Sequence, residues 1–209
     1  MFGTNFSHTL AIIFITSVIS VVAFNNSAVM NRLLMWPPAV RRGQFDRFIT
    51  YGFIHAQDGG IHLLFNMVTL YFFGRAIEHF YRDYFAGMGF VLFYLAALIV
   101  TILPSYIRHR NDARYMSLGA SGAVSAIVFA YILFAPWNKI LFFFIPIPAI
   151  LYAMLYIMYC IYAAKHGKGN VNHTGHLYGA AFGIVATVAI EPSLLNAFSH
   201  KLLHTQTSY

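Results

Sequence analysis

The chain has 209 residues, of which 59% are hydrophobic, 18% are aromatic and only 9% are charged. Soluble domains carry about 25% charged residues, so this composition excludes a water-facing surface and predicts an integral membrane protein. The net charge of +7 favours anchoring at lipid headgroups over nucleic-acid binding, and the single cysteine excludes an intrachain disulfide.

Six apolar stretches are long enough, or nearly so, to cross a bilayer core, which takes about 20 residues of helix. They lie at about 8–25, 61–79, 84–103, 117–135, 139–164 and 174–190. We therefore expect an all-α membrane protein in which residues 1–209 form a single domain with six transmembrane helices. No Lys or Arg precedes the first stretch and no convincing cleavage site follows it, so we expect it to be a retained helix and not a secretory signal.

The connection at 26–60 is long and mixes aromatic with basic side chains. Such side chains prefer the headgroup layer, so this first loop is expected to lie in the membrane interface. In the fifth stretch, Pro146 and Pro148 each remove a backbone N–H donor. Their presence predicts a kink or a local loosening of that helix.

Polar residues stand at the starts of the second, fourth and sixth stretches, where apolar residues would be less costly. An even number of crossings places these three starts on one side of the membrane at similar depth. Ionisable groups inside spans are costly and indicate a functional site. The residues are His62 and Asn66, Ser121 and Ser125, and His173 and His176.

These side chains are suited to serine nucleophilic catalysis. A serine hydroxyl becomes a nucleophile when a neighbouring histidine takes its proton, and Ser121 and His176 are the candidates. Attack on a carbonyl builds negative charge on its oxygen. His62, Asn66 and the backbone N–H of Ser121 are candidate donors to that oxyanion, and one such donor is worth about 3 kcal/mol in the barrier.

Small residues surround the two candidates. Taken singly, such residues are more often a packing surface, and intramembrane polar groups are more often contacts between helices. Their coincidence on one face favours a site, because close packing of the sixth helix against the fourth would let the histidine reach the serine. The small residues are Gly119 and Gly122 beside the serine, and Gly179 and Gly183 after the histidine.

A metal centre is the main chemical alternative. His173 and His176, with His62 nearby, offer imidazoles that suit zinc. The sequence has no HExxH motif, and no Asp or Glu lies in the same stretch to complete a site or act as a base. We therefore expect no catalytic metal.

Three segments resemble the signature motifs of the rhomboid intramembrane serine proteases. HLLFN (62–66) is similar to the HxxxN of the second helix, GASG (119–122) to the GxSG of the fourth, and HLYGAAFG (176–183) to the HxxGxxxG of the sixth. GRAIE (74–78) also resembles the family's GxxxE. The resemblance covers about residues 45–190.

The resemblance implies a six-transmembrane-helix, rhomboid-like bundle with a long interfacial first loop. It implies a Ser121–His176 dyad with an oxyanion hole that includes His62 and Asn66, and it implies no metal or organic cofactor. The expected partners are single-pass transmembrane protein substrates and the lipid bilayer, with no nucleic acid. The fifth helix would be the moving lateral gate, and the oligomeric state is left undetermined.

Three features depart from the family pattern. Asp46–Arg47 stands where many members have Trp–Arg, and Ser125 stands where bacterial members often have a tyrosine that packs on the histidine, so another aromatic residue must support His176. Basic residues are usually enriched in cytoplasmic loops, and here nine lie on the side opposite the termini against four on the side of the termini. This positive-inside rule would put both termini outside the cytoplasm. The family layout implies cytoplasmic termini, and we follow it because long interfacial loops weaken the charge rule.

Two other functions compete with an active protease. A catalytically inactive relative that captures or escorts membrane proteins would typically lack the serine or the histidine. A small-solute transporter would show polar residues in both halves of the membrane and repeat symmetry, and neither is visible here. We expect the cytoplasmic membrane of a bacterium, with an organelle membrane as the alternative.

Overall fold

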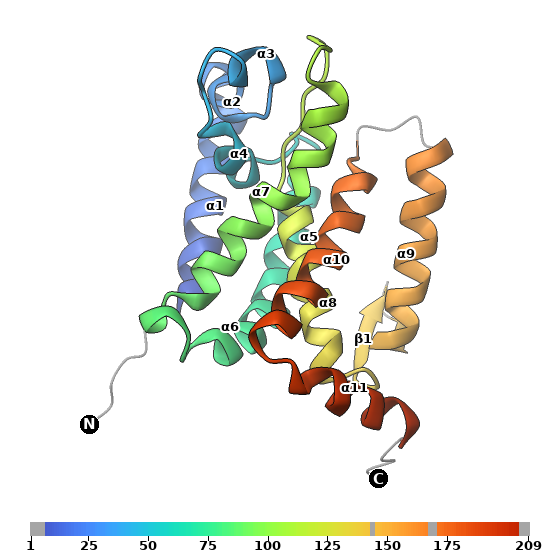
Figure 1. Ribbon diagram of the computed structural model, residues 1–209. Helices are drawn as coiled ribbons and strands as arrows, with labels where there is room; N and C mark the ends of the chain where they lie inside the picture. The colour runs from blue at the N-terminus through green and yellow to red at the C-terminus, as the bar shows by residue number, and fades with distance from the viewer. Residues whose placement is uncertain (1–6, 143–144, 167–170, 205–209) are drawn as a thin grey trace, which may run out of the picture.

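The computed structural model describes residues 7–142, 145–166 and 171–204. Within these ranges the chain is a bundle of helices, with shorter helices in the first loop and after the bundle (Figure 1). The helices are α1 (His8–Asn25), α2 (Ser27–Leu33), α3 (Pro37–Val40), α4 (Arg47–Thr50), α5 (Ile61–Thr69), α6 (Arg75–Tyr81), α7 (Gly89–His109), α8 (Ser121–Phe134), α9 (Ala149–His166), α10 (His173–Ile190) and α11 (Ser193–Leu203).

Three helices of the described chain, α1, α7 and α9, are each long and apolar enough to cross a membrane. A fourth crossing is possible if α10 and α11, which are bent by 115° at their junction, count as one broken span. The helix α8 is apolar but has only 14 residues, and a π-helical segment at Leu70–Gly74 joins α5 to α6. The apolar helices agree with an integral membrane bundle, while the count of six crossings stays a prediction.

The helix α8 lies at the centre of the bundle, and most of its side chains are buried. The helix α10 packs against it backbone to backbone. A methyl group added at Gly179 would overlap the carbonyl oxygen of Gly122, and one added at Gly183 would overlap the carbonyl oxygen of Ala126. Glycine at these two positions therefore sets how closely α10 can approach α8.

The first loop is anchored both to itself and to the turn before α8. Arg47 is buried, and its guanidinium donates to the carbonyl oxygens of Asn31 and Leu34. Met35 and Ser117 exchange two backbone hydrogen bonds of 2.9 and 3.1 Å. The loop is thus a folded unit built of α2, α3 and α4, and it is fastened to the segment that leads into α8.

The carboxylate of Glu78, the last residue of the GRAIE segment, caps the start of α1. Its oxygens accept hydrogen bonds from the Ser7 hydroxyl and from the backbone N–H groups of His8 and Thr9, at 2.6 to 3.1 Å. Four residues earlier, a methyl group on Gly74 would lie 3.0 Å from the Thr9 side chain. The glycine therefore permits the close approach of α1, and the glutamate satisfies the N–H groups that a helix start leaves unpaired.

The prediction of a helix over 139–164 is wrong at 139–142 and 145–148, and residues 143–144 of that stretch lie outside the described residues. These residues contribute the strands β1 (Lys139–Phe142) and β2 (Ile145–Pro148), which pair antiparallel, and α9 begins at Ala149. Pro146 and Pro148 lie in β2, so neither of them kinks a helix. A proline in a helix interior costs about 3 kcal/mol, whereas a strand of a two-stranded sheet has an unpaired edge where the missing N–H is tolerated.

Candidate active site

The first turns of α5, α8 and α10 lie in the same half of the bundle, opposite the end where α1 starts and α11 lies (Figure 1). Each of these turns carries one of the polar segments singled out in the sequence. His62 stands in the first turn of α5, Ser121 opens α8 and His176 lies in the first turn of α10. The fold therefore brings together three segments that are far apart in the sequence.

Ser121 and His176 are in direct contact. The Ser121 hydroxyl oxygen lies 2.6 Å from Nε2 of His176. When the imidazole is neutral and carries its proton on Nδ1, Nε2 accepts the serine hydroxyl hydrogen, which is the arrangement that a general base requires. The distance is within the hydrogen-bond range needed for direct proton transfer from the serine to the histidine.

The turn before Ser121 depends on Gly119. This residue has φ = +109°, a conformation that side chains rarely adopt, and a methyl group there would lie 3.1 Å from Cε1 of His62. Its N–H donates to the carbonyl oxygen of Tyr51 in the first loop at 2.9 Å. The turn is therefore held from the loop side, and its shape leaves room for the His62 ring.

His55 also holds this turn, although no sequence motif marks it as part of the site. It is fully buried, and its Nε2 accepts the backbone N–H of Ala120 at 3.3 Å. Nδ1 lies 3.0 Å from the hydroxyl oxygen of Ser20, which itself donates to the carbonyl oxygen of Phe53. An accepting Nε2 requires the proton on Nδ1, so the chain of hydrogen bonds fixes a neutral imidazole.

The surroundings of His55 keep it uncharged. Burial, and then the neighbouring His62 imidazole, lower the pKa of His55 to about 3. The two rings meet edge to face, with centroids 5.3 Å apart. His55 thus links the first loop to the backbone next to Ser121 without adding a charge near the dyad.

His62 and Asn66 lie beside the serine in the wall of one cavity. Asn66 is buried, and its side-chain amide donates to the carbonyl oxygen of His62 at 2.8 Å. The carboxylate of Asp58 accepts the backbone N–H of His62 at 3.3 Å, which anchors the start of α5. Both residues expected at the oxyanion hole are therefore close to the dyad, with the amide of Asn66 turned toward its own helix.

Tyr156 is the aromatic side chain that packs on His176. Its ring stacks on the imidazole with centroids 6.1 Å apart and planes 27° apart. Its hydroxyl lies 2.5 Å from that of Ser125, which donates to the backbone carbonyl oxygen of Ser121 at 2.8 Å. A tyrosine from α9, with its hydroxyl beside that of a serine from α8, is thus the aromatic support of the histidine that the sequence left open. The sequence shows four tyrosines in α9 but not which of them faces the histidine.

Two cavities meet at the dyad. The larger, of about 630 Å³, lies between the first loop, the turn before α8 and the start of α10. The smaller, of about 280 Å³, lies between α5, α8 and α9 and is lined by apolar and aromatic side chains that include Phe65 and Tyr152. Ser121, His62 and His176 line both cavities. The serine is therefore reached from two directions.

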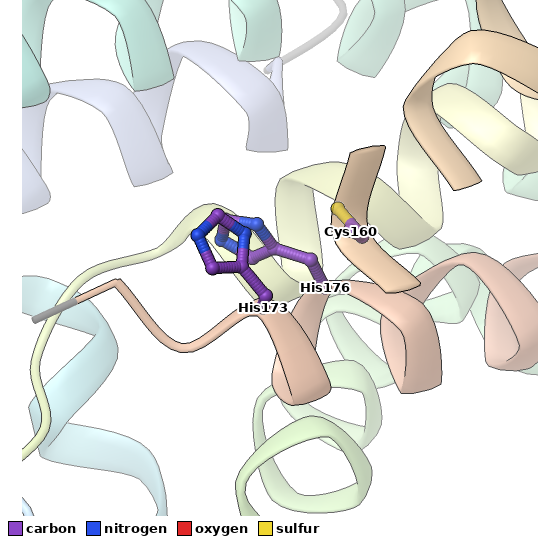
Figure 2. Close-up of side chains that lie close together, drawn as sticks. All are labelled: Cys160, His173 and His176. Atoms are coloured by element: carbon purple, nitrogen blue, oxygen red, sulfur yellow. The ribbon is translucent and has the colours of Figure 1, made fainter. Parts of the chain in front are cut away.

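The described residues also contain one group with metal-ligand chemistry at the dyad. Cys160, His173 and His176 offer ligand atoms that all lie within 4.8 Å of one another (Figure 2). In the sequence, His62 is the third imidazole expected near these two histidines. The structure instead places Cys160 of α9 beside them.

Comparisons with known proteins agree with this architecture. Residues 42–192 match the family model of the Rhomboid domain. The chain is 33% identical to RHOMBOID-like protein 12, mitochondrial, of Arabidopsis thaliana over 181 residues, which cover 80% of this chain and 53% of that protein. It is 29% identical to Rhomboid protease GluP of Bacillus subtilis (strain 168) over 165 residues, which cover 78% of this chain and 30% of that protein.

The chain thus spans about half the length of the plant relative and less than a third of the bacterial one. The family match nevertheless covers most of the chain and includes the segments that carry the serine, the histidines and the asparagine described above. This protein is an integral membrane protein that belongs to the rhomboid family, a family of intramembrane proteases.

Proposed function

We propose that this protein is a serine endopeptidase that cleaves peptide bonds within or beside the transmembrane segments of other membrane proteins. The observation that carries the proposal is the 2.6 Å contact between Ser121 and His176, at the point where the two cavities meet. We further propose that the substrates are single-pass membrane proteins. Their apolar segment, once partly unwound, suits the aromatic and apolar lining of the smaller cavity.

In the first step, His176 Nε2 takes the hydroxyl proton of Ser121 while the serine oxygen attacks the peptide carbonyl carbon. The oxyanion that forms would receive hydrogen bonds from His62, from the Asn66 amide after it turns away from its own helix, and from the N–H at the start of α8. The first N–H groups of a helix have no partner within the helix, which makes them suitable donors.

The protonated His176 then gives its proton to the leaving amine, and the acyl group stays on Ser121. Water must reach this ester for the second half of the reaction. The larger cavity supplies a route from the loop side, so a segment bound in the smaller cavity does not block the water. His176 activates that water in the same way, and the acid product leaves.

The test uses a fluorophosphonate probe, which forms a covalent bond with an activated serine. We expect the purified protein in detergent to be labelled, and Ser121→Ala and His176→Ala to lose labelling. Ser199→Ala is the matched control, since Ser199 lies on the exposed face of α11 and should leave labelling unchanged. Equal labelling of the wild type and Ser121→Ala would overturn the assignment of the nucleophile.

The same measurement separates the protease from its competitors. A folded wild-type protein that is not labelled, and does not cleave a single-pass test protein in liposomes, would favour the inactive binding or escort relative.

The location is also part of the proposal. The two relatives come from a mitochondrial and a bacterial setting. We propose the bacterial cytoplasmic membrane, and fractionation of the source cells distinguishes it from an organelle membrane.

A further inference from the structure

Cys160 on α9 faces the two histidines at the start of α10. One ligand atom of each of Cys160, His173 and His176 lies within 4.8 Å of the other two (Figure 2). One thiol and two imidazoles form a donor set typical of zinc and similar borderline-soft cations. Of these three residues, only His176 has a part in the proposed reaction.

The other two side chains are placed as ligands would be. Nδ1 of His173 is buried and has no hydrogen-bond partner among the residues that the structure describes. A buried polar atom without a partner costs about 1–3 kcal/mol, so such an atom calls for a reason. Cys160 is fully buried beside it and is free of any disulfide. A bound cation would satisfy the nitrogen and use the sulfur at once.

We propose that Cys160, His173 and His176 bind a divalent cation of the zinc class, and that this binding switches the dyad off. In a tetrahedral zinc site, bonds of about 2.0–2.3 Å place ligand atoms roughly 3.4–3.6 Å apart. A pair of atoms as far apart as the 4.8 Å limit must therefore close by roughly 1.2–1.4 Å. Small rotations of the side chains, or a small shift of α9 toward α10, accomplish this.

The inhibition follows from the lone pairs of the imidazole. On binding, the Cys160 thiol loses its proton to solvent and the sulfur donates to the cation. If Nε2 of His176 binds the cation, the serine loses its proton acceptor directly. If Nδ1 binds it, the remaining ring proton must sit on Nε2, which then cannot accept the Ser121 proton. Either mode leaves the serine without a base.

The inhibitory consequence rests on the proposed protease function, but the binding itself does not. Binding is measured with cobalt(II) added to the full-length protein in detergent. We expect a thiolate-to-cobalt charge-transfer band in the near ultraviolet that zinc then removes. Cys160→Ala should lack the band. Ser121→Ala should retain it, and so should His166→Ala, a matched control at the exposed end of α9.

Inhibition is measured as the zinc dependence of fluorophosphonate labelling. Cys160→Ala should be labelled as fast as the wild type without zinc and should need more than about tenfold higher zinc for half-inhibition, since even outer-shell changes cost 10–100-fold in metal affinity. A missing cobalt band, or equal zinc sensitivity of both proteins, would overturn the cation site. A Cys160-dependent cobalt band in a protein that is never labelled would support the site while the protease proposal fails.

Discussion

Replacing Tyr156 tests how the histidine of the dyad is supported. The ring of Tyr156 stacks on His176, and its hydroxyl lies 2.5 Å from that of Ser125. Tyr156→Ala removes both the ring and the hydroxyl, whereas Tyr156→Phe removes the hydroxyl alone. The two variants therefore separate the contribution of the stacked ring from that of the hydrogen bond.

The expected magnitude follows from the charge that His176 would acquire in the transition state of the proposed reaction. An aromatic face attracts a desolvated cation by about 0.5–2 kcal/mol within about 6 Å, and the two centroids here are 6.1 Å apart. The ring also orients the imidazole. A total of about 1–2 kcal/mol corresponds to a rate lowered roughly five- to thirtyfold for Tyr156→Ala. Tyr156→Phe keeps the ring and should lose less than about threefold.

The assay is the second-order rate constant of fluorophosphonate labelling, which needs His176 as a base but needs no knowledge of the substrate. Tyr159→Ala is the matched control, because Tyr159 is 60% exposed on the same helix and contacts His173, not Ser121 or His176. Tyr156→Ala with a wild-type rate constant would refute the reasoning. Equal losses for Tyr156→Phe and Tyr156→Ala would show that the hydroxyl, and not the ring, supports the histidine.

Three further predictions concern stability, each measured by thermal unfolding in detergent. Gly183→Ala sets a methyl group against the carbonyl oxygen of Ala126 and should cost about 1–3 kcal/mol; an unchanged midpoint would contradict close packing of α10 on α8. His55 is neutral in the folded protein, with a pKa of about 3 against 6.5 in the unfolded chain. Its contribution to the free energy of unfolding is therefore complete above pH 6.5 and is lost as the pH falls toward 3. At pH 5 the free energy of unfolding is lower by about 2 kcal/mol, and His55→Gln should make the unfolding midpoint less dependent on pH. An equal pH dependence of the midpoint in both proteins would exclude His55 as its source. Glu78→Gln weakens the cap of α1 and should cost about 1 kcal/mol, and a midpoint equal to that of the wild type would show that the cap is dispensable.

The meeting of the serine and the histidine was predictable because it depends on periodic patterns. Small residues four apart on one helix face predict close packing whatever the rest of the fold, and the structure places α10 against α8 at those glycines. The starts of alternate spans lie on one side of a membrane for simple topological reasons. Ser121 and His176 could therefore be paired from the sequence alone, before any distance between them was known.

Other features depend on contacts that have no sequence period. The hairpin before α9 lies in an apolar run whose composition fits a helix or a strand, so its prolines predict a kink within a helix although they lie in a strand. Tyr156 stacks on His176 from α9, and His55 accepts the N–H of Ala120, next to Ser121, from the first loop. Which face of α9 meets α10, and how a loop of 35 residues folds, is set by tertiary packing that no small-residue pattern marks in those segments.

If α8 crosses the membrane as proposed, its shortness sets the depth of the proposed reaction. Its 14 residues rise about 21 Å, while a bilayer hydrocarbon core is about 30 Å thick. A helix that ends at the far boundary thus leaves its first residue about 9 Å below the near one. Ser121 is that first residue. For the proposed helical substrate, with a rise of about 1.5 Å per residue, the bond level with the serine would lie about six residues inside the apolar segment.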